Sequence, residues 1–444
     1  MYCARCGTEC QPEYKFCRNC GADVTAAGGT RDIPIAAPPP HLAVQAVAAV
    51  VYTSVPLPPP PLHGPPVYYY PQAVPQTHIV HQIHVMESLR GRIQSLASTE
   101  SLEGFSLRQM FSEVFKRRSA DEVEEYILVG TARNTPPIDV VETGWPKPWL
   151  FFRLLAALVI AYAALTFLFM WTGNTNCIPG MMFLGAFAVP LATLVLFFEL
   201  NTPRNVSLHM IGKLFLMGAV VSLAVALLGY SLPIFELSNM EAGIVEEVAK
   251  LLTVVLVMRS VRYKYILNGI LFGATVGAGF AAFETAGYAL NEGFLQGLLP
   301  AVLQGGALTP QVMGPAMQQG VGQMLSILFL RGILAPLGHV AWTAIAAGAF
   351  WRVKGDKPFS VTMLFDKRFL MAFAIPVALH AIWDAPVQLP FEGNQILTGV
   401  VTWYVVFGLV QQGLRQVKAE QKTHLQVTLE TVEASLQPAG GVTV

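Results

Sequence analysis

Charged residues are scarce in this chain of 444 residues. They make up 13% of it, against about 25% in an ordinary soluble domain, while hydrophobic residues make up 53%. The scarcity is uneven, because residues 1–146 are rich in charge, proline and polar groups, whereas 147–413 contain long apolar runs separated by short loops. One soluble core would not divide in this way, so we expect an all-α polytopic membrane protein with a polar N-terminal region.

Net charge and a secretory signal are both absent. The chain has 28 basic and 28 acidic residues, which gives no reason to expect a nucleic-acid partner. Residues 1–24 are polar and rich in cysteine, unlike a signal peptide. The apolar stretch 42–55 is shorter than the roughly 20 residues that a membrane-spanning helix needs. We therefore expect the N-terminus to remain in the cytoplasm.

Cysteine is concentrated at the N-terminus, where Cys-x2-Cys, ten residues and a second Cys-x2-Cys follow one another. Two such pairs predict a structural Zn²⁺ held by four thiolates, those of Cys3, Cys6, Cys17 and Cys20. A disulfide-linked segment is the alternative, which a reducing cytoplasm disfavours. The segment resembles the short bacterial zinc-ribbon family. A site closed by four cysteines implies a module that binds an unknown cytosolic partner, and not a catalytic one.

Composition divides the chain into five parts. The ribbon (1–24) is followed by a Pro/Ala-rich linker (25–85) and by a segment with the periodicity of amphipathic cytosolic helices (86–146). A transmembrane domain (147–413) and a cytosolic tail (414–444) complete it.

The transmembrane domain contains eight apolar stretches, which we expect to be spans. Counted from the cytoplasm, the loops on the outer side contain no Lys or Arg, while the inner loops and the tail are basic. This asymmetry predicts that both termini are cytoplasmic. The expected spans are 149–171, 179–199, 212–230, 242–258, 266–290, 333–351, 369–389 and 396–413.

Ionisable residues occur within four of these stretches, although a charge at bilayer depth costs roughly 3 kcal/mol or more. Helical rise places them all within roughly 6–14 Å of the outer surface, provided that the sixth span begins near 333. Residues 320–331 would then form an interfacial or re-entrant piece. The candidates for a site are Glu246, Glu247, Lys250, Glu284, His339, His380 and Asp384.

Small residues recur every four positions in the fifth stretch, at Gly269, Gly273, Gly277 and Ala281. This spacing allows two helices to approach closely, and we expect it to serve packing.

Carboxylates and histidines that meet in an apolar site suit two kinds of chemistry. They could hold a Zn²⁺ that activates water, or a glutamate could act as general base on a water that the histidines orient. Peptide hydrolysis fits either, and Lys250 or Arg331 could stabilise the negative charge that develops.

Four short motifs in this order resemble those of the PrsW intramembrane proteases, relatives of the CAAX-prenyl endopeptidase (CPBP) superfamily. The resemblance covers residues 241–390 and implies a peptidase of a bacterial inner membrane that cleaves a membrane-anchored protein. It also implies that Glu246 or Glu247 is the base, with Glu284, His339 and His380 as partners or metal ligands. The motifs are EExxK at 246–250, FxxxE at 280–284, GHVAWT at 338–343 and HxxWD at 380–384.

Other classes of function remain open from the sequence. Intramembrane Glu, His and Lys also build proton relays, so a proton-coupled transporter or channel is one alternative. A catalytically inactive receptor that signals through its ribbon is another. Asp384 could simply end a helix, and His339 could be a hydrogen-bonded packing residue.

Overall fold

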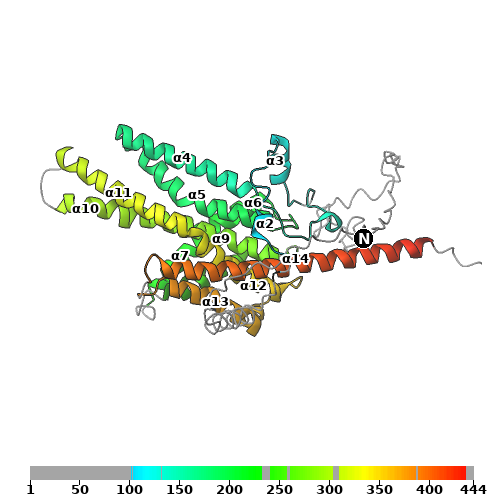
Figure 1. Cartoon of the computed structure of the whole chain (residues 1–444). Helices are drawn as coiled ribbons and strands as arrows, with labels where there is room; N and C mark the ends of the chain where they lie inside the picture. Colours follow the sequence, from blue (N-terminus) through cyan, green and yellow to red (C-terminus); the bar gives the residue numbers. More distant parts are fainter. Residues whose placement is uncertain are drawn as a thin grey trace, which may run out of the picture. The chain divides into compact units, whose positions relative to one another are not determined.

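A computed structural model of the chain describes residues 102, 104–131, 133–232, 241–257, 261–303, 310–386 and 389–436 (Figure 1). Every regular element in those residues is a helix, which confirms the expected all-α class for this part of the chain. The expected zinc ribbon and the Pro/Ala-rich linker lie outside the described residues.

Six helical segments in this part of the chain are long and apolar enough to cross a membrane. They confirm a multi-pass membrane protein. The first, α4, is mostly exposed in its apolar part, as a helix that faces lipid must be. The segments are α4 (Leu150–Thr172), α5 (Cys177–Leu200), α6–α7 (Leu208–Tyr230), α9 with its continuation (Ile266–Leu299), α11–α12 (Val312–Lys354) and α14 (Gly393–Val432).

Two of the eight expected spans are shorter helices. The fourth corresponds to α8 (Ala242–Val257), with 16 residues, and the seventh to α13 (Lys367–Trp383), with 17. Both are shorter than the roughly 20 residues of a full span, so the count of eight stays a prediction. These two helices carry most of the ionisable candidates.

The helix α9 (Ile266–Tyr288) is the centre of the bundle, and its glycines set its closest contact. A Cβ on Gly273 would lie 2.1 Å from the carbonyl oxygen of Thr343, and one on Gly277 would lie 2.4 Å from that of His339. Neither residue could therefore carry a side chain without pushing α12 (His339–Lys354) away. The small-residue stripe thus serves packing, as expected, and it also brings the backbone of His339 against α9.

The chain after α9 forms two further helices, which pack against each other. A π-helical turn, η6 (Ala289–Leu295), continues α9 into α10 (Gln296–Leu303), and α11 (Pro310–Leu334) returns alongside it (Figure 1). The expected interfacial piece 320–331 lies within α11, whose Met324 and Leu328 are buried in a cluster with α5. The expected break is present slightly later, at a 3₁₀ turn over Ala335–Leu337. A regular helix is favoured for 320–331 because α5 and η6 cover its apolar face.

The segment before α4 forms two short helices, α2 (Leu107–Met110) and α3 (Ala120–Ile127). Ser119 and Glu122 form a capping box that starts α3. At the far end of the chain, α14 (Gly393–Leu436) runs beyond the bundle as one continuous helix (Figure 1).

Candidate active site

The helix α8 presents two carboxylates and an ammonium on one face. Lys250 Nζ lies 2.6 Å from Glu247 Oε1 and 3.6 Å from Glu246 Oε2, as their spacing of three and four residues predicts. Glu247 and Lys250 are fully buried, while Glu246 retains 6% of its exposure. The ammonium offsets part of the cost of burying these carboxylates together.

Each of the two histidines is held at one ring nitrogen by a carboxylate. His380 Nδ1 lies 3.0 Å from Glu247 Oε1, and His339 Nε2 lies 3.0 Å from Glu284 Oε2. A histidine that binds a metal commonly donates its other ring N–H to a carboxylate, which fixes its tautomer and orientation. The same arrangement occurs here twice, on residues from α8, α9, α12 and α13.

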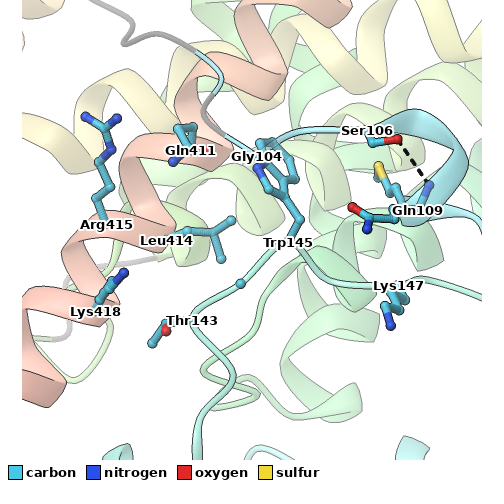
Figure 2. A pocket seen from close by; sticks show the side chains of 12 residues that line it. Gly104, Ser106, Gln109, Thr143, Trp145, Lys147, Gln411, Leu414, Arg415 and Lys418 are labelled. Carbon is cyan, nitrogen blue, oxygen red and sulfur yellow. Dashed lines mark hydrogen bonds between the residues drawn. The ribbon is translucent and has the colours of Figure 1, made fainter. Parts of the chain in front are cut away.

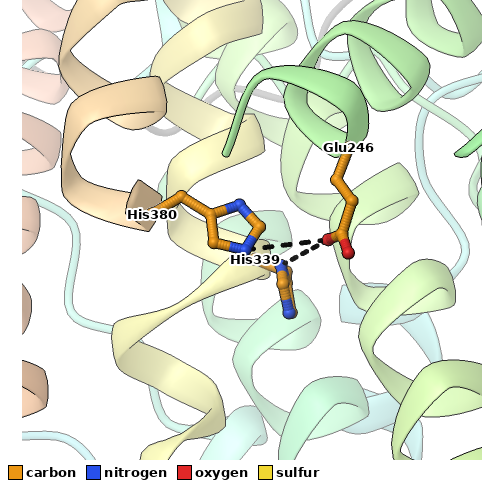
Figure 3. Close-up of side chains that lie close together, drawn as sticks. All are labelled: Glu246, His339 and His380. Carbon is orange, nitrogen blue, oxygen red and sulfur yellow. Dashed lines mark ion pairs between the residues drawn. The ribbon is translucent and has the colours of Figure 1, made fainter. Parts of the chain in front are cut away.

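The other nitrogen of each histidine faces Glu246 (Figure 3). Glu246 Oε2 lies 3.7 Å from His339 Nδ1 and 3.8 Å from His380 Nε2, and it has no hydrogen-bond partner among the described residues. One donor atom from each of the three residues lies within 4.8 Å of the other two. Ligands of a tetrahedral Zn²⁺ at about 2.0–2.2 Å lie roughly 3.3–3.6 Å apart, so a small contraction would give three ligand positions.

This trio differs from the expected ligand set in one member. We expected Glu284 beside the two histidines, and the structure brings Glu246 to that position while Glu284 contacts the far nitrogen of His339. Lys250 opposes a metal, because its Nζ lies 3.0 Å from His339 Nδ1, the atom that would be a ligand. Metal binding therefore requires Lys250 to give up this contact and keep its ion pair with Glu247.

Carboxylates outnumber cations in the cluster. Four of them (Glu246, Glu247, Glu284 and Asp384) face Lys250 and Arg331. The excess of two negative charges equals the charge of one divalent cation, and uncompensated buried charge is costly. Either a bound metal or protonated histidines would offset it.

Arg331 and Asp384 lie at the edge of the cluster. The Arg331 guanidinium pairs with Glu284, donates to Thr285 Oγ1 at 3.1 Å and lies over the ring of Tyr288. Asp384 ends α13, and its Oδ2 lies 3.2 Å from His380 Nε2, although a third of its side chain is exposed. Asp384 thus both ends a helix and contacts a site histidine.

Two residues of the site, Tyr230 and Trp342, were not among the expected site residues, although Trp342 lies within the GHVAWT motif. Tyr230, at the end of α7 (Leu223–Tyr230), donates its hydroxyl to Glu246 Oε1 at 2.8 Å. Trp342 is fully buried, stacks on the ring of His380 at 4.5 Å and donates to Thr402 Oγ1. An aromatic residue at the end of an apolar stretch usually marks the membrane interface, so only the folded structure assigns these contacts.

Two cavities reach the cluster. The larger, about 570 Å³, lies between α7, α8 and α9 and is lined by Tyr230, Glu246, Glu284 and apolar side chains. The smaller, about 190 Å³, reaches His339 beside Arg331. The larger cavity is the only one of the two that Glu246 lines, and it gives that carboxylate access to water or to a substrate.

The chain was compared with known protein families, curated proteins and solved structures. Residues 206–410 match the family described as PrsW family intramembrane metalloproteases. No curated protein and no solved structure matches the chain. The matched range contains all seven candidate residues from Glu246 to Asp384, together with the apolar helices around them. The chain is a multi-pass membrane protein with peptidase activity, similar over this range to the PrsW family.

Proposed function

We propose that the chain hydrolyses a peptide bond of a membrane-anchored protein at a metal site formed by Glu246, His339 and His380. One observation carries the proposal: Glu246 Oε2 is buried without a hydrogen-bond partner among the described residues and faces two histidine nitrogens whose far sides are held by carboxylates. A bound Zn²⁺ would supply an activated water and polarise the scissile carbonyl. The residues present fit such an ion in type, number and charge.

The protein's own groups prepare this chemistry. Glu247 and Glu284 each accept a hydrogen bond from one histidine. In a neutral ring this leaves a lone pair on the opposite nitrogen, which becomes available to a metal once Lys250 gives up its contact with His339 Nδ1 and Asp384 its contact with His380 Nε2. Stacking on Trp342 fixes the plane of His380. Lys250 neutralises Glu247, so that Glu246 remains available to the metal or to a water.

Glu246 is the better candidate for the reacting glutamate. Glu247 is fully buried, and its Oε1 is engaged by both Lys250 and His380. Glu246 lines the larger cavity and is oriented by Tyr230. A carboxylate must reach water to act as a base, and Glu246 is the one placed to do so.

A second version needs no metal. The contact between Lys250 Nζ and His339 Nδ1 favours it, because that contact uses one of the ligand nitrogens. In this version Glu246 takes a proton from a water that His380 orients, and the water oxygen attacks the peptide carbonyl. Glu246 then returns the proton to the amide nitrogen as the C–N bond breaks, which releases a carboxylic acid and an amine. Metal content distinguishes the two versions.

The substrate and its orientation follow from the surroundings of the site. Leu223, Leu227 and Phe283 line the larger cavity beside the carboxylates, which suits a segment that leaves an apolar environment. The absence of Lys and Arg from 172–178, 231–241, 291–320 and 390–395 supports a site toward the outer face of a bacterial inner membrane, with both termini cytoplasmic. Cleavage would then occur near the extracytoplasmic side.

The N-terminal cysteines belong to a separate part of this proposal. Cys3, Cys6, Cys17 and Cys20 would hold a structural zinc in the cytoplasm and present a surface to a cytosolic partner. That zinc takes no part in hydrolysis.

The test compares Glu246→Gln with Glu292→Gln, the same change at a second carboxylate of the larger cavity. Membrane proteins of cells that express each form would be compared by mass spectrometry for fragments cut near the outer face. Glu246→Gln should abolish the fragments that appear with the wild type, while Glu292→Gln should retain them. Full activity of Glu246→Gln at equal abundance would overturn the proposal, and proton flux in proteoliposomes that depends on Glu284 would favour a transporter.

A further inference from the structure

A cavity of about 530 Å³ lies far from the peptidase site, at the end of the bundle where α4 begins (Figure 2). It lies between α14 and the segment before α4. Three cations line it, Lys147, Arg415 and Lys418, and none of the described residues in its wall is acidic. Within the described residues the Lys418 ammonium has no ion-pair or hydrogen-bond partner, while Lys147 also lines a neighbouring cavity together with Glu113. A cavity of this composition attracts an anion.

The cavity lies where the membrane meets water. Lys147 comes three residues before α4, and Arg415 is the first charged residue after the apolar part of α14. The segment before α4 and the helix α14 come together here, because Trp145 and Leu414 belong to the same wall. Tryptophan, lysine and arginine are the residues that contact lipid headgroups at such a boundary.

The wall also contains polar atoms without partners. Trp145 Nε1 and Gln411 Oε1 are buried with no hydrogen-bond partner among the described residues, and only 8% of Gln411 is exposed. Buried polar groups normally have partners, so these two point to a ligand that completes them. The Gln411 amide could present either its oxygen or its nitrogen to such a ligand.

Apolar and polar groups share this wall. Met110, Leu414 and Trp145 line the same cavity as the cations. Figure 2 shows Leu414 near Arg415 and Lys418, with Trp145 between this group and Lys147. A soluble phosphate would use the cations alone, whereas a lipid would also place its glycerol and upper acyl chains against the apolar groups. The combination therefore favours a ligand that belongs to the membrane.

We propose that this cavity binds the phosphate ester of an anionic glycerophospholipid, with its headgroup among Lys147, Arg415 and Lys418. A headgroup with a phosphodiester and free hydroxyls offers acceptors to the cations and to Trp145, and a donor to Gln411. The bound lipid would join the segment before α4 to α14, two parts of the chain that meet at this wall. The inference concerns a site separate from the peptidase and does not depend on it.

The test uses the full-length protein purified in a neutral detergent. Its thermal unfolding would be followed with added phosphatidylglycerol, with zwitterionic phosphatidylcholine, and with inorganic phosphate or glycerol phosphate. Phosphatidylglycerol should raise the melting temperature, phosphatidylcholine should not, and added salt should weaken the effect. Equal stabilisation by a soluble phosphate at the same concentration would overturn the lipid as the source of the anion.

Paired variants locate the effect. The double variant Lys147→Gln/Lys418→Gln should bind phosphatidylglycerol roughly 30-fold more weakly, since each lysine near a membrane surface contributes roughly fivefold. Lys357→Gln/Lys422→Gln removes the same charge from lysines outside the cavity and should bind as the wild type does. Equal affinity of the two double variants would overturn the proposal. If the first double variant does not fold, Trp145→Phe can be used instead, because it removes a single hydrogen-bond donor. Trp145→Phe should bind phosphatidylglycerol more weakly than the wild type, and unchanged affinity would overturn the proposal.

Discussion

Two buried acidic centres lie at opposite ends of this bundle, and they differ in whether their oxygens are satisfied. At the end where α4 begins, Glu199 accepts the backbone N–H groups of Trp149, Leu150 and Phe151 at 2.7–2.9 Å, and the hydroxyl of Tyr126 at 3.3 Å. At the other end, Glu246 Oε2 is buried with no hydrogen-bond partner among the described residues, and the Lys250 ammonium lies 3.6 Å away.

The difference separates a structural carboxylate from a functional one. The first turn of a helix has N–H groups with no acceptor inside the helix, and it attracts negative charge. Glu199 accepts hydrogen bonds from these groups at the start of α4, so both the N–H groups and the carboxylate have partners. Burial, with Glu199 nearby, raises the pKa of the Tyr126 hydroxyl, so Tyr126 remains a donor at any physiological pH. Glu246 instead keeps an oxygen free beside two histidines, an arrangement that costs stability unless a ligand completes it.

The largest expected effect concerns metal at the Glu246 end. With Cys3, Cys6, Cys17 and Cys20 all changed to serine, the full chain should still hold about one zinc per molecule, and a chelator should remove both zinc and cleavage. A further His380→Ala change should reduce zinc to background and cleavage by at least a hundredfold, whereas His424→Ala, at a histidine outside the site, should leave both unchanged. Elemental analysis and a cleavage assay provide the two readouts; zinc-free protein with full activity would favour the metal-free version.

A smaller effect is expected from the carboxylates that hold the histidines. Glu284→Gln and Glu247→Gln should each lower cleavage roughly 10–100-fold, because a partner of a metal-bound histidine tunes affinity without being a ligand. Titration with zinc should restore part of the activity of Glu284→Gln and none of that of Glu246→Gln. Loss in Glu284→Gln that no zinc concentration relieves would make Glu284 a participant in the reaction itself.

A change at Tyr230 should lower cleavage less than the changes at Glu284 and Glu247. Tyr230→Phe removes one hydrogen bond to Glu246 and should lower cleavage less than tenfold, with the zinc content unchanged. Tyr288→Phe is the matched control, because Tyr288 lines the same cavity and no hydrogen bond joins it to Glu246. Equal activity of the two variants would show that this hydrogen bond does not position Glu246.

The smallest effect on cleavage is expected at Glu199. Glu199→Ala leaves three backbone N–H groups without their acceptor and should destabilise the protein by on the order of 3 kcal/mol. Cleavage per folded molecule should remain as in the wild type. Thermal unfolding in detergent, with the exposed Glu125→Ala as control, measures the first quantity. If fully folded Glu199→Ala protein cleaved its substrate more slowly than the wild type, Glu199 would not be a purely structural carboxylate, and the two centres would not differ as described.

Much of the candidate site could be predicted because helical spacing is regular. The spacing of Glu246, Glu247 and Lys250 placed them on one face, and equal depth in neighbouring helices predicted that Glu284, His339 and His380 would meet. The contacts among these residues agree with that reading. His339 could reach this level because the chain breaks at Ala335–Leu337, close to the expected position.

Glu199 shows where such reasoning stops. It ends an apolar stretch and precedes a loop, which is an ordinary place for a carboxylate, and nothing local indicates that three backbone groups some 50 residues earlier will meet it. The position of Glu246, and not Glu284, between the two histidines is similar, since depth alone cannot say which oxygen faces which nitrogen. Helix rotation and side-chain rotamers decide that, and both are set by packing.

By itself the sequence determined an all-helical chain in a membrane, the helices that carry ionisable groups and the kind of chemistry they suit, because hydropathy and helical period are local properties. Only the tertiary structure decided that α8 and α13 are shorter than full spans and that 320–331 lies within a long helix on α5. It also decided that Oε2 of Glu246 has no hydrogen-bond partner among the described residues. The physical reason is that whether a buried polar atom is satisfied depends on groups that the fold brings from distant parts of the chain.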